Sequence, residues 1–239
     1  MQRYFGSIIG KQVLLSEEDA KHLVKVMRAN PGEQIEIVNE GTAYLAEIKT
    51  THPLVIEILS RIKEKRELEN DVILIAALIK GDKLDYVLQK ATELGVREIV
   101  LLSSERTIVK AKDFDSSRKL ERYRRILREA AMQSHRSTIP DLYRLITVDQ
   151  LKTIKADIKM IAYEGQAGST KSLWNAFKPI EKGDKIAVVI GPEGGFSEKE
   201  VNKAVKAGYT PVSLGHRILR AETASIYTLS VLSAYLEKK

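Results

Sequence analysis

From residue 72 onward, short apolar runs alternate with longer amphipathic segments. Residues 72–79 are continuously apolar, residues 82–94 have helical spacing and end at Gly95, and residues 98–102, apolar after Glu98, are predicted to form a second strand. Apolar runs of this length are typical of strands buried on both faces, and glycine commonly ends a helix. Because strands that alternate with helices favour a parallel sheet covered on both faces, this part of the chain is predicted to be α/β.

The alternation continues to the end of the chain. Ser197 and Glu200 have the spacing of a helix capping box, and Gly208 closes the helix that they open. Residues 164–169 are predicted to form a loop. The same periodicity predicts helices over residues 116–134 and 222–236, and strands over residues 142–146, 159–163, 185–190 and 211–214.

The first part of the chain has a different pattern. Residues 16–19 can cap a helix that continues over residues 20–27 and stops before Pro31. Three strand-like runs follow, at residues 34–38, 43–49 and 54–62. One helix with short strands, separated by turn residues, predicts a small β-barrel.

Between the two patterns lies a segment, residues 61–70, that is charged from end to end. Such segments are typical of linkers between domains. We therefore predict two domains, a β-barrel at residues 1–68 and an α/β domain at residues 69–239. A chain of 239 residues is long enough to bury a substantial hydrophobic core.

Composition argues against several classes of protein. The chain has no cysteine, and its four histidines lack the spacing of metal ligands, so we expect neither a disulfide nor a metal site. The best candidate for a membrane span, residues 72–79, is too short, and the first residues lack the apolar core of a signal peptide. We therefore expect a cytoplasmic protein with no membrane partner. A net charge of +7 favours an anionic partner such as nucleic acid.

Two unusual loops follow predicted strands. Residues 191–196 read Gly-Pro-Glu-Gly-Gly-Phe, and residues 215–220 read Gly-His-Arg-Ile-Leu-Arg. In a parallel sheet, ligands bind where loops leave the carboxyl ends of strands, and right-handed crossovers keep both loops on one edge. The second loop also combines an apolar wall with two cations. Together the loops predict a single binding site.

Neither loop matches a nucleotide-phosphate site. A dinucleotide-binding turn has the spacing Gly-x-Gly-x-x-Gly after the first strand, whereas residues 80–83 read Lys-Gly-Asp-Lys there. The phosphate loop of nucleoside triphosphatases ends in Gly-Lys-Ser/Thr, whereas Phe196 and Ser197 follow Gly195. Glu193 would also repel a polyphosphate. The site therefore favours a ligand with little negative charge, and an enzyme that uses NAD or a nucleotide is disfavoured.

These loops also carry a family resemblance. Residues 191–197, read with residues 214–224, resemble the signature of the RsmE family, the 16S ribosomal RNA (uridine) N3-methyltransferases of the SPOUT superfamily. The resemblance covers nearly the whole chain, with a departure at Met132, where glutamate is common in the family. Supporting segments are residues 22–28 before Gly32, 80–85, 89–95, 104–106 and 129–134 with Arg136.

The resemblance implies a fold, a cofactor and partners. The fold would be an N-terminal PUA-like barrel and a C-terminal α/β domain whose last segment forms a trefoil knot. Family members are homodimers that bind S-adenosylmethionine in the knot and act on ribosomal RNA of the small subunit. The implied cofactor-binding residues are Glu164, Ile190, Gly191, Pro192, Gly194, Gly195, Leu214, Gly215, Ile218, Leu219, Arg220, Thr223 and Ala224.

Methyl transfer to N3 of uridine requires that the base lose the proton on its ring nitrogen. Arg220, which we rank first, or Arg217 can stabilise the anion that develops on the base. Glu193 or Glu222 can accept the proton, and the sequence leaves this choice open. Glu222 is equally suited to stabilise the positive end of the last helix.

Positive charge gathers on the predicted helix at residues 116–134. Its apolar residues fall three or four positions apart and form one inward stripe, so its arginines and lysines largely face outward. Together with cations of the first domain, this face is suited to track RNA phosphates. The candidate RNA-binding residues are Arg3, Lys25, Arg28, Arg106, Arg122, Arg125, Gln133, Ser134, Arg136 and Arg217.

The sequence leaves other functions open. A protein with the same fold can bind RNA or assist ribosome assembly without catalysing methyl transfer, or can modify another RNA or another atom. The helix at residues 222–236 is more apolar than one buried face requires. It is suited either to a dimer interface or to a wholly internal position.

Overall fold

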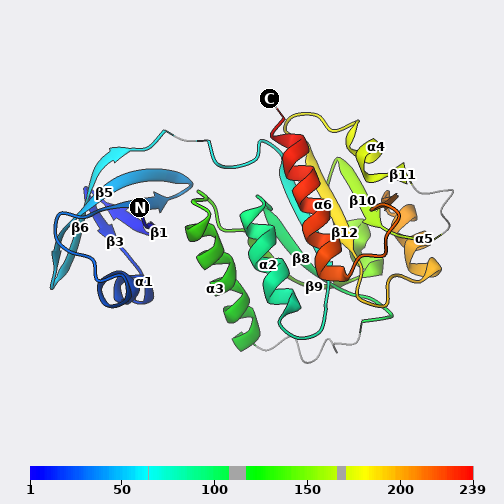
Figure 1. Ribbon diagram of the computed structural model, residues 1–239, viewed down its shortest axis with the longest axis horizontal. Helices are drawn as coiled ribbons and strands as arrows, with labels where there is room; N and C mark the ends of the chain where they lie inside the picture. Colours follow the sequence, from blue (N-terminus) through cyan, green and yellow to red (C-terminus); the bar gives the residue numbers. More distant parts are fainter. Residues whose placement is uncertain (64, 108–116, 166–170, 239) are drawn as a thin grey trace. The chain divides into compact units, whose positions relative to one another are not determined.

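The computed structural model describes residues 1–63, 65–107, 117–165 and 171–238 (Figure 1). The chain forms two compact units, of which the first contains residues 1–67 and 131–138 and the second contains residues 68–130 and 139–239. The two units separate within the charged segment 61–70. The sequence pattern did not predict that residues 131–138 pack with the first unit.

A six-stranded sheet forms most of the first unit. Its order is β1-β4-β5-β6-β3-β2, in which β1 and β4 are parallel and the other neighbours are antiparallel. The predicted β4, β5 and β6 are confirmed, whereas the first three strands were not predicted because each has only three residues. The strands are β1 (Arg3–Phe5), β2 (Ser7–Ile9), β3 (Gln12–Leu14), β4 (Gln34–Asn39), β5 (Thr42–Thr51) and β6 (Leu54–Arg61).

The predicted helix of this unit is present but has two parts. Ser16 caps it, because its Oγ accepts a hydrogen bond from the backbone N–H of Asp19 at 3.1 Å. An α-helix, α1 (Glu17–Lys21), leads directly into a π-helical segment, η1 (His22–Val26). Leu23 of η1 is buried in the core of the unit, which holds this segment against the sheet.

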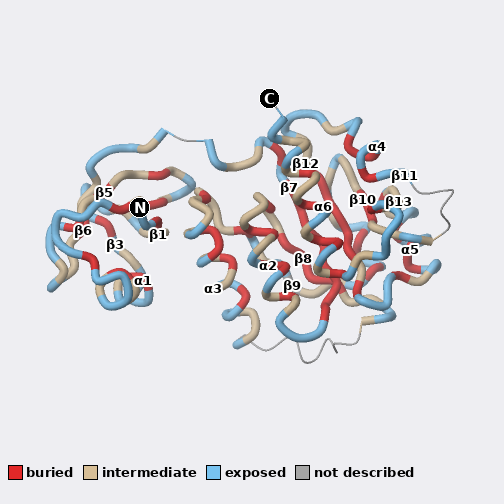
Figure 2. The backbone as a smooth tube through the Cα atoms, viewed as in Figure 1, coloured by how far each residue is buried: buried red, intermediate tan, exposed pale blue. Residues whose placement is uncertain are grey.

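A seven-stranded parallel sheet is the centre of the second unit, which confirms the predicted α/β architecture. Its order is β11-β13-β10-β12-β7-β8-β9. The central strands β7 and β12 are almost wholly buried (Figure 2). The strands are β7 (Asp71–Ala77), β8 (Glu98–Ser103), β9 (Asp141–Thr147), β10 (Ile158–Ala162), β11 (Lys171–Ser172), β12 (Lys185–Ile190) and β13 (Thr210–Ser213).

Helices cover both faces of this sheet. Successive residues of β7 point to opposite faces, so Leu74 packs in one core cluster and Ile75 in the other. Residue 116 of one predicted helix and residues 166–169 of the predicted loop lie outside the described residues. The helices are α2 (Lys83–Glu93), α3 (Ser117–Gln133), α4 (Leu173–Phe177) and α6 (Ala221–Leu236) on the face of Leu74, and α5 (Glu198–Lys206) with the 3-10 helix η3 (Val148–Thr153) on the other.

All strands of this parallel sheet end at one edge, where loops leave it. Because the strands are parallel, β7, β10, β12 and β13 all end at this edge. Ser197 and Glu200 form the predicted capping box and begin α5 directly after the loop that follows β12. The two loops singled out in the sequence therefore reach the same edge. The loops after these four strands follow residues 77, 162, 190 and 213.

Candidate cofactor-binding site

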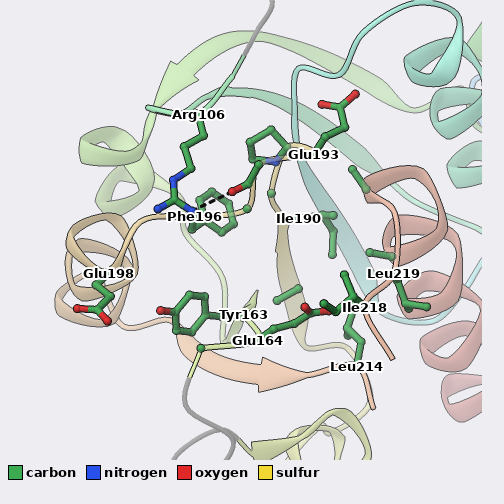
Figure 3. Close-up of a pocket in the computed structure, with 18 residues that line it drawn as sticks. Arg106, Tyr163, Glu164, Ile190, Glu193, Phe196, Glu198, Leu214, Ile218 and Leu219 are labelled. Carbon is green, nitrogen blue, oxygen red and sulfur yellow. Dashed lines mark hydrogen bonds between the residues drawn. The ribbon is translucent and has the colours of Figure 1, made fainter. Parts of the chain in front are cut away.

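A cavity of about 480 Å³ lies at this edge of the parallel sheet (Figure 3). Its volume is in the range of sites for small molecules. Both predicted loops line it, which confirms that they form one pocket. The predicted cofactor residues in the lining are Glu164, Ile190, Gly191, Pro192, Gly194, Gly195, Leu214, Ile218, Leu219 and Ala224.

Three predicted cofactor residues, Gly215, Arg220 and Thr223, are absent from the described lining of the cavity. Other lining residues were not among the individual cofactor contacts predicted above, although Tyr163, Gly165 and Glu193 belong to loops that the family resemblance places around the cofactor. Part of this group comes from the end of β10, which lies between β12 and β13 in the sheet. The additional lining residues are Arg106, Ala162, Tyr163, Gly165, Glu193, Phe196, Glu198 and Ala221.

Three positions in the loop after β12 favour glycine, each for a different structural reason. A Cβ atom on Gly191 would lie 3.0 Å from the ring of Phe196, which is buried. A Cβ atom on Gly194 would lie 3.0 Å from the Cβ of Arg106. Gly195 has a φ of +65°, in the left-handed region that glycine adopts without strain. The absence of these side chains lets the loop backbone form part of the cavity wall.

Apolar side chains form another wall of the cavity. Leu214 is buried at the end of β13, and Leu219 is half-buried before α6. Ile218 also lines the cavity, yet 88% of its surface is exposed. Large apolar side chains that remain exposed in a cavity are typical of a binding surface, because a ligand can cover them.

One candidate proton acceptor contacts the segment between β7 and α2, and the other contacts the first residue of α2. The Oε1 of Glu193 accepts a hydrogen bond from the backbone N–H of Lys80 at 3.2 Å, and its carboxylate points away from the middle of the cavity (Figure 3). The Oε1 of Glu222 lies 3.3 Å from the Nζ of Lys83. Its Oε2 is buried and has no hydrogen-bond partner among the described residues. Glu222 therefore keeps an acceptor atom that no described residue uses, although it is not in the described lining of the cavity. Glu193 is in the lining, and one of its oxygens is bonded to the backbone of Lys80.

The two cations of the second loop are exposed. Arg220 is the N-cap residue of α6, and its side chain does not cap the helix. Arg217 lies in the loop before it. Neither guanidinium has a hydrogen bond or ion pair with the part of the chain that the structure describes. Both side chains are therefore available to a ligand.

Two predicted RNA-binding residues, Arg3 and Arg136, are buried, which corrects the expectation that they face RNA. The side chain of Arg3 is 0% exposed, and its Nη1 donates a hydrogen bond to the carbonyl of His135 at 2.6 Å. Its Nε also donates to Glu36 at 2.8 Å. The side chain of Arg136 is 3% exposed and lies 2.6 Å from the carboxylate of Glu67. These bonds hold residues 131–138 within the first unit.

The remaining RNA-binding candidates reach the surface. Arg122 pairs with Asp85 at 2.9 Å, and Arg125 lies 3.8 Å from Glu129. Tyr123 of the same helix is buried with the predicted inward stripe. Apart from Ser134, which is half-buried, the exposed candidates are Lys25, Arg28, Arg106, Arg122, Arg125, Gln133 and Arg217.

Within the described ranges, no group of three or more histidine, aspartate or glutamate side chains is placed to hold a metal ion. No helix in these ranges is both long enough and apolar enough to cross a membrane.

Family models match both parts of the chain. Residues 66–233 match an RNA methyltransferase domain, and residues 15–59 match an RNA methyltransferase PUA domain. The parallel sheet, the pocket at its edge and these matches define an RNA methyltransferase. Within this class, the chain belongs to the ribosomal RNA small subunit methyltransferase E family. The Bacillus subtilis member is 34% identical over 99% of this chain and 98% of its own length.

Solved structures agree with this assignment. A putative methyltransferase from Legionella pneumophila, in complex with S-adenosylmethionine, is 33% identical with a TM-score of 0.87, over 98% of this chain and 96% of its own. The ribosomal RNA small subunit methyltransferase E from Neisseria gonorrhoeae, also bound to S-adenosylmethionine, is 30% identical with a TM-score of 0.85 over 98% of both chains. The family that the sequence resembles is therefore confirmed.

Proposed function

We propose that the protein transfers a methyl group from S-adenosylmethionine to N3 of a uridine in 16S ribosomal RNA of the small subunit. The main support is the cavity at the sheet edge, which joins a glycine-rich loop to an apolar wall and has no lysine in its described lining. The relatives named for this activity, and those bound to S-adenosylmethionine, give independent support.

The described lining suits each part of this cofactor. The faces of adenine fit the apolar wall of Leu214, Ile218 and Leu219, and the loop backbone offers hydrogen-bond partners to the edge of the ring. The carboxylates of Glu164 and Glu198, which line the cavity, would balance the positive charges of the sulfonium and ammonium groups of a bound cofactor. The cofactor has no phosphate, so a phosphate-binding lysine is not required. Gly215 and Thr223 stay proposed cofactor contacts because they adjoin the lining, whereas we assign the side chain of Arg220 to the uracil base.

When bound, the cofactor supplies a methyl group on a positively charged sulfur. The chain's residues orient the two reactants, and orientation can contribute about 7–11 kcal/mol to lowering the barrier. Arg220 lies between Leu219 and Ala221, which both line the cavity. This position and its uncommitted guanidinium support the proposal that Arg220 stabilises the negative charge that develops on uracil. Arg217, three residues earlier in the loop, is proposed to contact the RNA.

We propose that Glu222, rather than Glu193, accepts the proton from the uracil nitrogen. One carboxylate oxygen of Glu222 is buried without a hydrogen-bond partner among the described residues. Lys83 holds the other oxygen and orients the carboxylate. Glu193 is directed to the backbone of Lys80 instead. A general base must have a free acceptor atom within reach of the proton, and Glu222 meets the first condition.

We propose RNA contacts on each unit taken by itself: Lys25 and Arg28 in the first unit, and the exposed cations of α3 with Arg217 in the second. Replacing Arg118, Arg124 and Arg125 by alanine is expected to flatten the dependence of RNA affinity on salt, because each lost phosphate contact removes about 0.7–0.9 from the logarithmic slope. Filter binding across a salt series measures this slope. The control replaces Lys152, Lys199 and Lys206 on the other face of the sheet. Equal slopes for both triple variants would exclude the α3 surface.

We further propose that the domains are those at residues 1–68 and 69–239, that the first sheet closes as a PUA-like barrel, and that the last segment is threaded as a trefoil knot. The likeness to the solved relatives supports these assignments. We propose a cytoplasmic homodimer that uses α6, on which Tyr227 is 41% exposed. Sedimentation of the purified protein distinguishes a dimer from a monomer.

Filling the cavity from α6 tests the cofactor site. Ala224 is buried and lines the cavity, so Ala224→Leu is expected to weaken S-adenosylmethionine binding about tenfold or more, since overpacking costs about 1–3 kcal/mol. Ala234→Leu, at an exposed position of the same helix, is the matched control. Calorimetric titration measures both affinities. Unchanged affinity in Ala224→Leu would place the cofactor elsewhere.

A further inference from the structure

We propose that Arg106 binds an oxyanion at the cofactor cavity and that Glu200 is the residue that positions it. This inference rests on the proposed function, because the oxyanion is either the carboxylate of S-adenosylmethionine or a phosphate of the RNA substrate. The sequence placed Arg106 among general RNA contacts and assigned no role to Glu200 beyond capping a helix.

Arg106 is fixed against the glycine-rich loop. Its Nη1 donates a hydrogen bond to the carbonyl of Gly194 at 2.9 Å, and Figure 3 shows the side chain reaching across the loop to this atom. The same glycine leaves room for the arginine stem, since a Cβ on Gly194 would lie only 3.0 Å from the Cβ of Arg106. The close approach therefore depends on both residues.

Charge makes Arg106 the anion-binding group of this cavity. It is the one cationic side chain in the described lining, which also contains the carboxylates Glu164, Glu193 and Glu198. Its bond to Gly194 is the one hydrogen bond or ion pair that its guanidinium makes within the described ranges. The residue is exposed, so its remaining N–H donors are open to a ligand. A guanidinium with free donors matches the geometry of a carboxylate or phosphate.

Glu200 holds the backbone beside Arg106. Its side chain belongs to a residue that is only 2% exposed, and each of its carboxylate oxygens accepts a backbone hydrogen bond at 2.9 Å. One bond comes from Ser197 at the start of α5, and the other comes from Glu105, 95 residues away in sequence. The turn that carries Arg106 is thereby tied to the helix that follows the glycine-rich loop. The buried carboxylate of Glu200 therefore holds the backbone next to Arg106 and the backbone that follows the glycine-rich loop.

The test compares Arg106→Ala with the unchanged protein in two measurements. Calorimetry gives the affinities for S-adenosylmethionine and for 5′-methylthioadenosine, which lacks the amino acid part, and steady-state transfer gives KM for RNA. The loss of a charge-assisted hydrogen bond is expected to change one of these constants about tenfold or more. The matched control is Arg97→Ala, at a residue just before the start of β8 rather than after its end, and it is expected to change none of the three constants.

Two outcomes support the proposal and separate the source of the oxyanion. Weaker binding of S-adenosylmethionine with unchanged binding of 5′-methylthioadenosine identifies the cofactor carboxylate. Unchanged cofactor affinity with a higher KM for RNA identifies a phosphate. The proposal is overturned if all constants stay the same, or if both nucleoside affinities fall equally. If the unchanged protein transfers no methyl group, the proposed function fails, whereas the calorimetric comparison still stands.

The role of Glu200 is tested by a double-mutant cycle. Glu200→Gln keeps one acceptor oxygen and cannot accept both backbone N–H groups, so it is expected to weaken the same constant as Arg106→Ala. If Glu200 acts through Arg106, the double variant loses no more than Arg106→Ala alone. With Glu200 unchanged, Arg106→Lys keeps the positive charge and should lose less of the affected constant than Arg106→Ala does. Additive losses in the cycle would show that Glu200 has only a structural role.

Discussion

Replacement of Arg220 by alanine is expected to slow methyl transfer about 10²–10³-fold, which is typical for the loss of a group that stabilises a developing anion. The affinity for S-adenosylmethionine should change little, because Arg220 does not belong to the described lining of the cavity. The fold should not change, since the guanidinium has no hydrogen bond or ion pair with any described residue. Single-turnover transfer with saturating cofactor measures the rate of the chemical step.

Three further variants make this result specific. Arg217→Ala should mainly raise KM for RNA. Glu222→Gln should slow the chemical step by about 10²-fold or more, the effect of losing a general base. Glu193→Gln keeps an acceptor oxygen for the N–H of Lys80 and should leave the rate within a few-fold. Turnover near that of the unchanged protein in Arg220→Ala would remove this residue from the mechanism.

Replacement of Arg136 by alanine is expected to lower the free energy of unfolding by about 3 kcal/mol, because it removes a buried guanidinium and leaves the half-buried carboxylate of Glu67 with only backbone N–H donors. In the folded protein, Arg136 donates to both oxygens of Glu67 at 3.5, 3.1 and 2.6 Å. Urea denaturation of the full chain measures the change. Arg125→Ala is the control, because its partner Glu129 is exposed and 3.8 Å away, and its cost should stay within about 0.5 kcal/mol.

The same contact makes stability depend on pH. Burial by itself would raise the pKa of Glu67, but the hydrogen bonds and the charge of Arg136 outweigh it and hold this pKa below its ordinary value of 4.5. The ionised carboxylate therefore contributes stability that is fully present above pH 4.5 and is lost as the pH falls through the lowered pKa. The difference between the unchanged protein and Arg136→Ala should shrink over that range. A difference that stays constant at lower pH would contradict this linkage.

Periodicity was sufficient to predict the central part of the fold. The apolar runs that became β7, β8 and β12, and the cap that begins α5, are local signals that tertiary structure does not override. The three-residue strands β1, β2 and β3 and the short β11, α4 and η3 were missed because so few residues show no period. Chain order also could not place β10 between β12 and β13.

Residue types predicted the pocket better than the surface. The glycines and apolar residues of the two loops all serve local backbone or wall geometry, so their spacing was informative. Arg3 and Arg136 were assigned to RNA by charge alone, whereas each is paired with a carboxylate distant in sequence. The contact of Arg106 with Gly194 spans 88 residues and has no local signature either. Charge in a sequence indicates a partner but does not say whether that partner is internal.

Mapping the methylated atom is the most direct test of the proposed function. Purified protein is incubated with S-adenosylmethionine and small ribosomal subunits that lack the modification, and the 16S ribosomal RNA is then digested and sequenced by mass spectrometry. We predict that a single uridine gains a methyl group on N3 and that Arg220→Ala yields little product under the same conditions. Methylation of another atom or another RNA, or no transfer by protein that binds both the cofactor and the subunit, would contradict the proposed function.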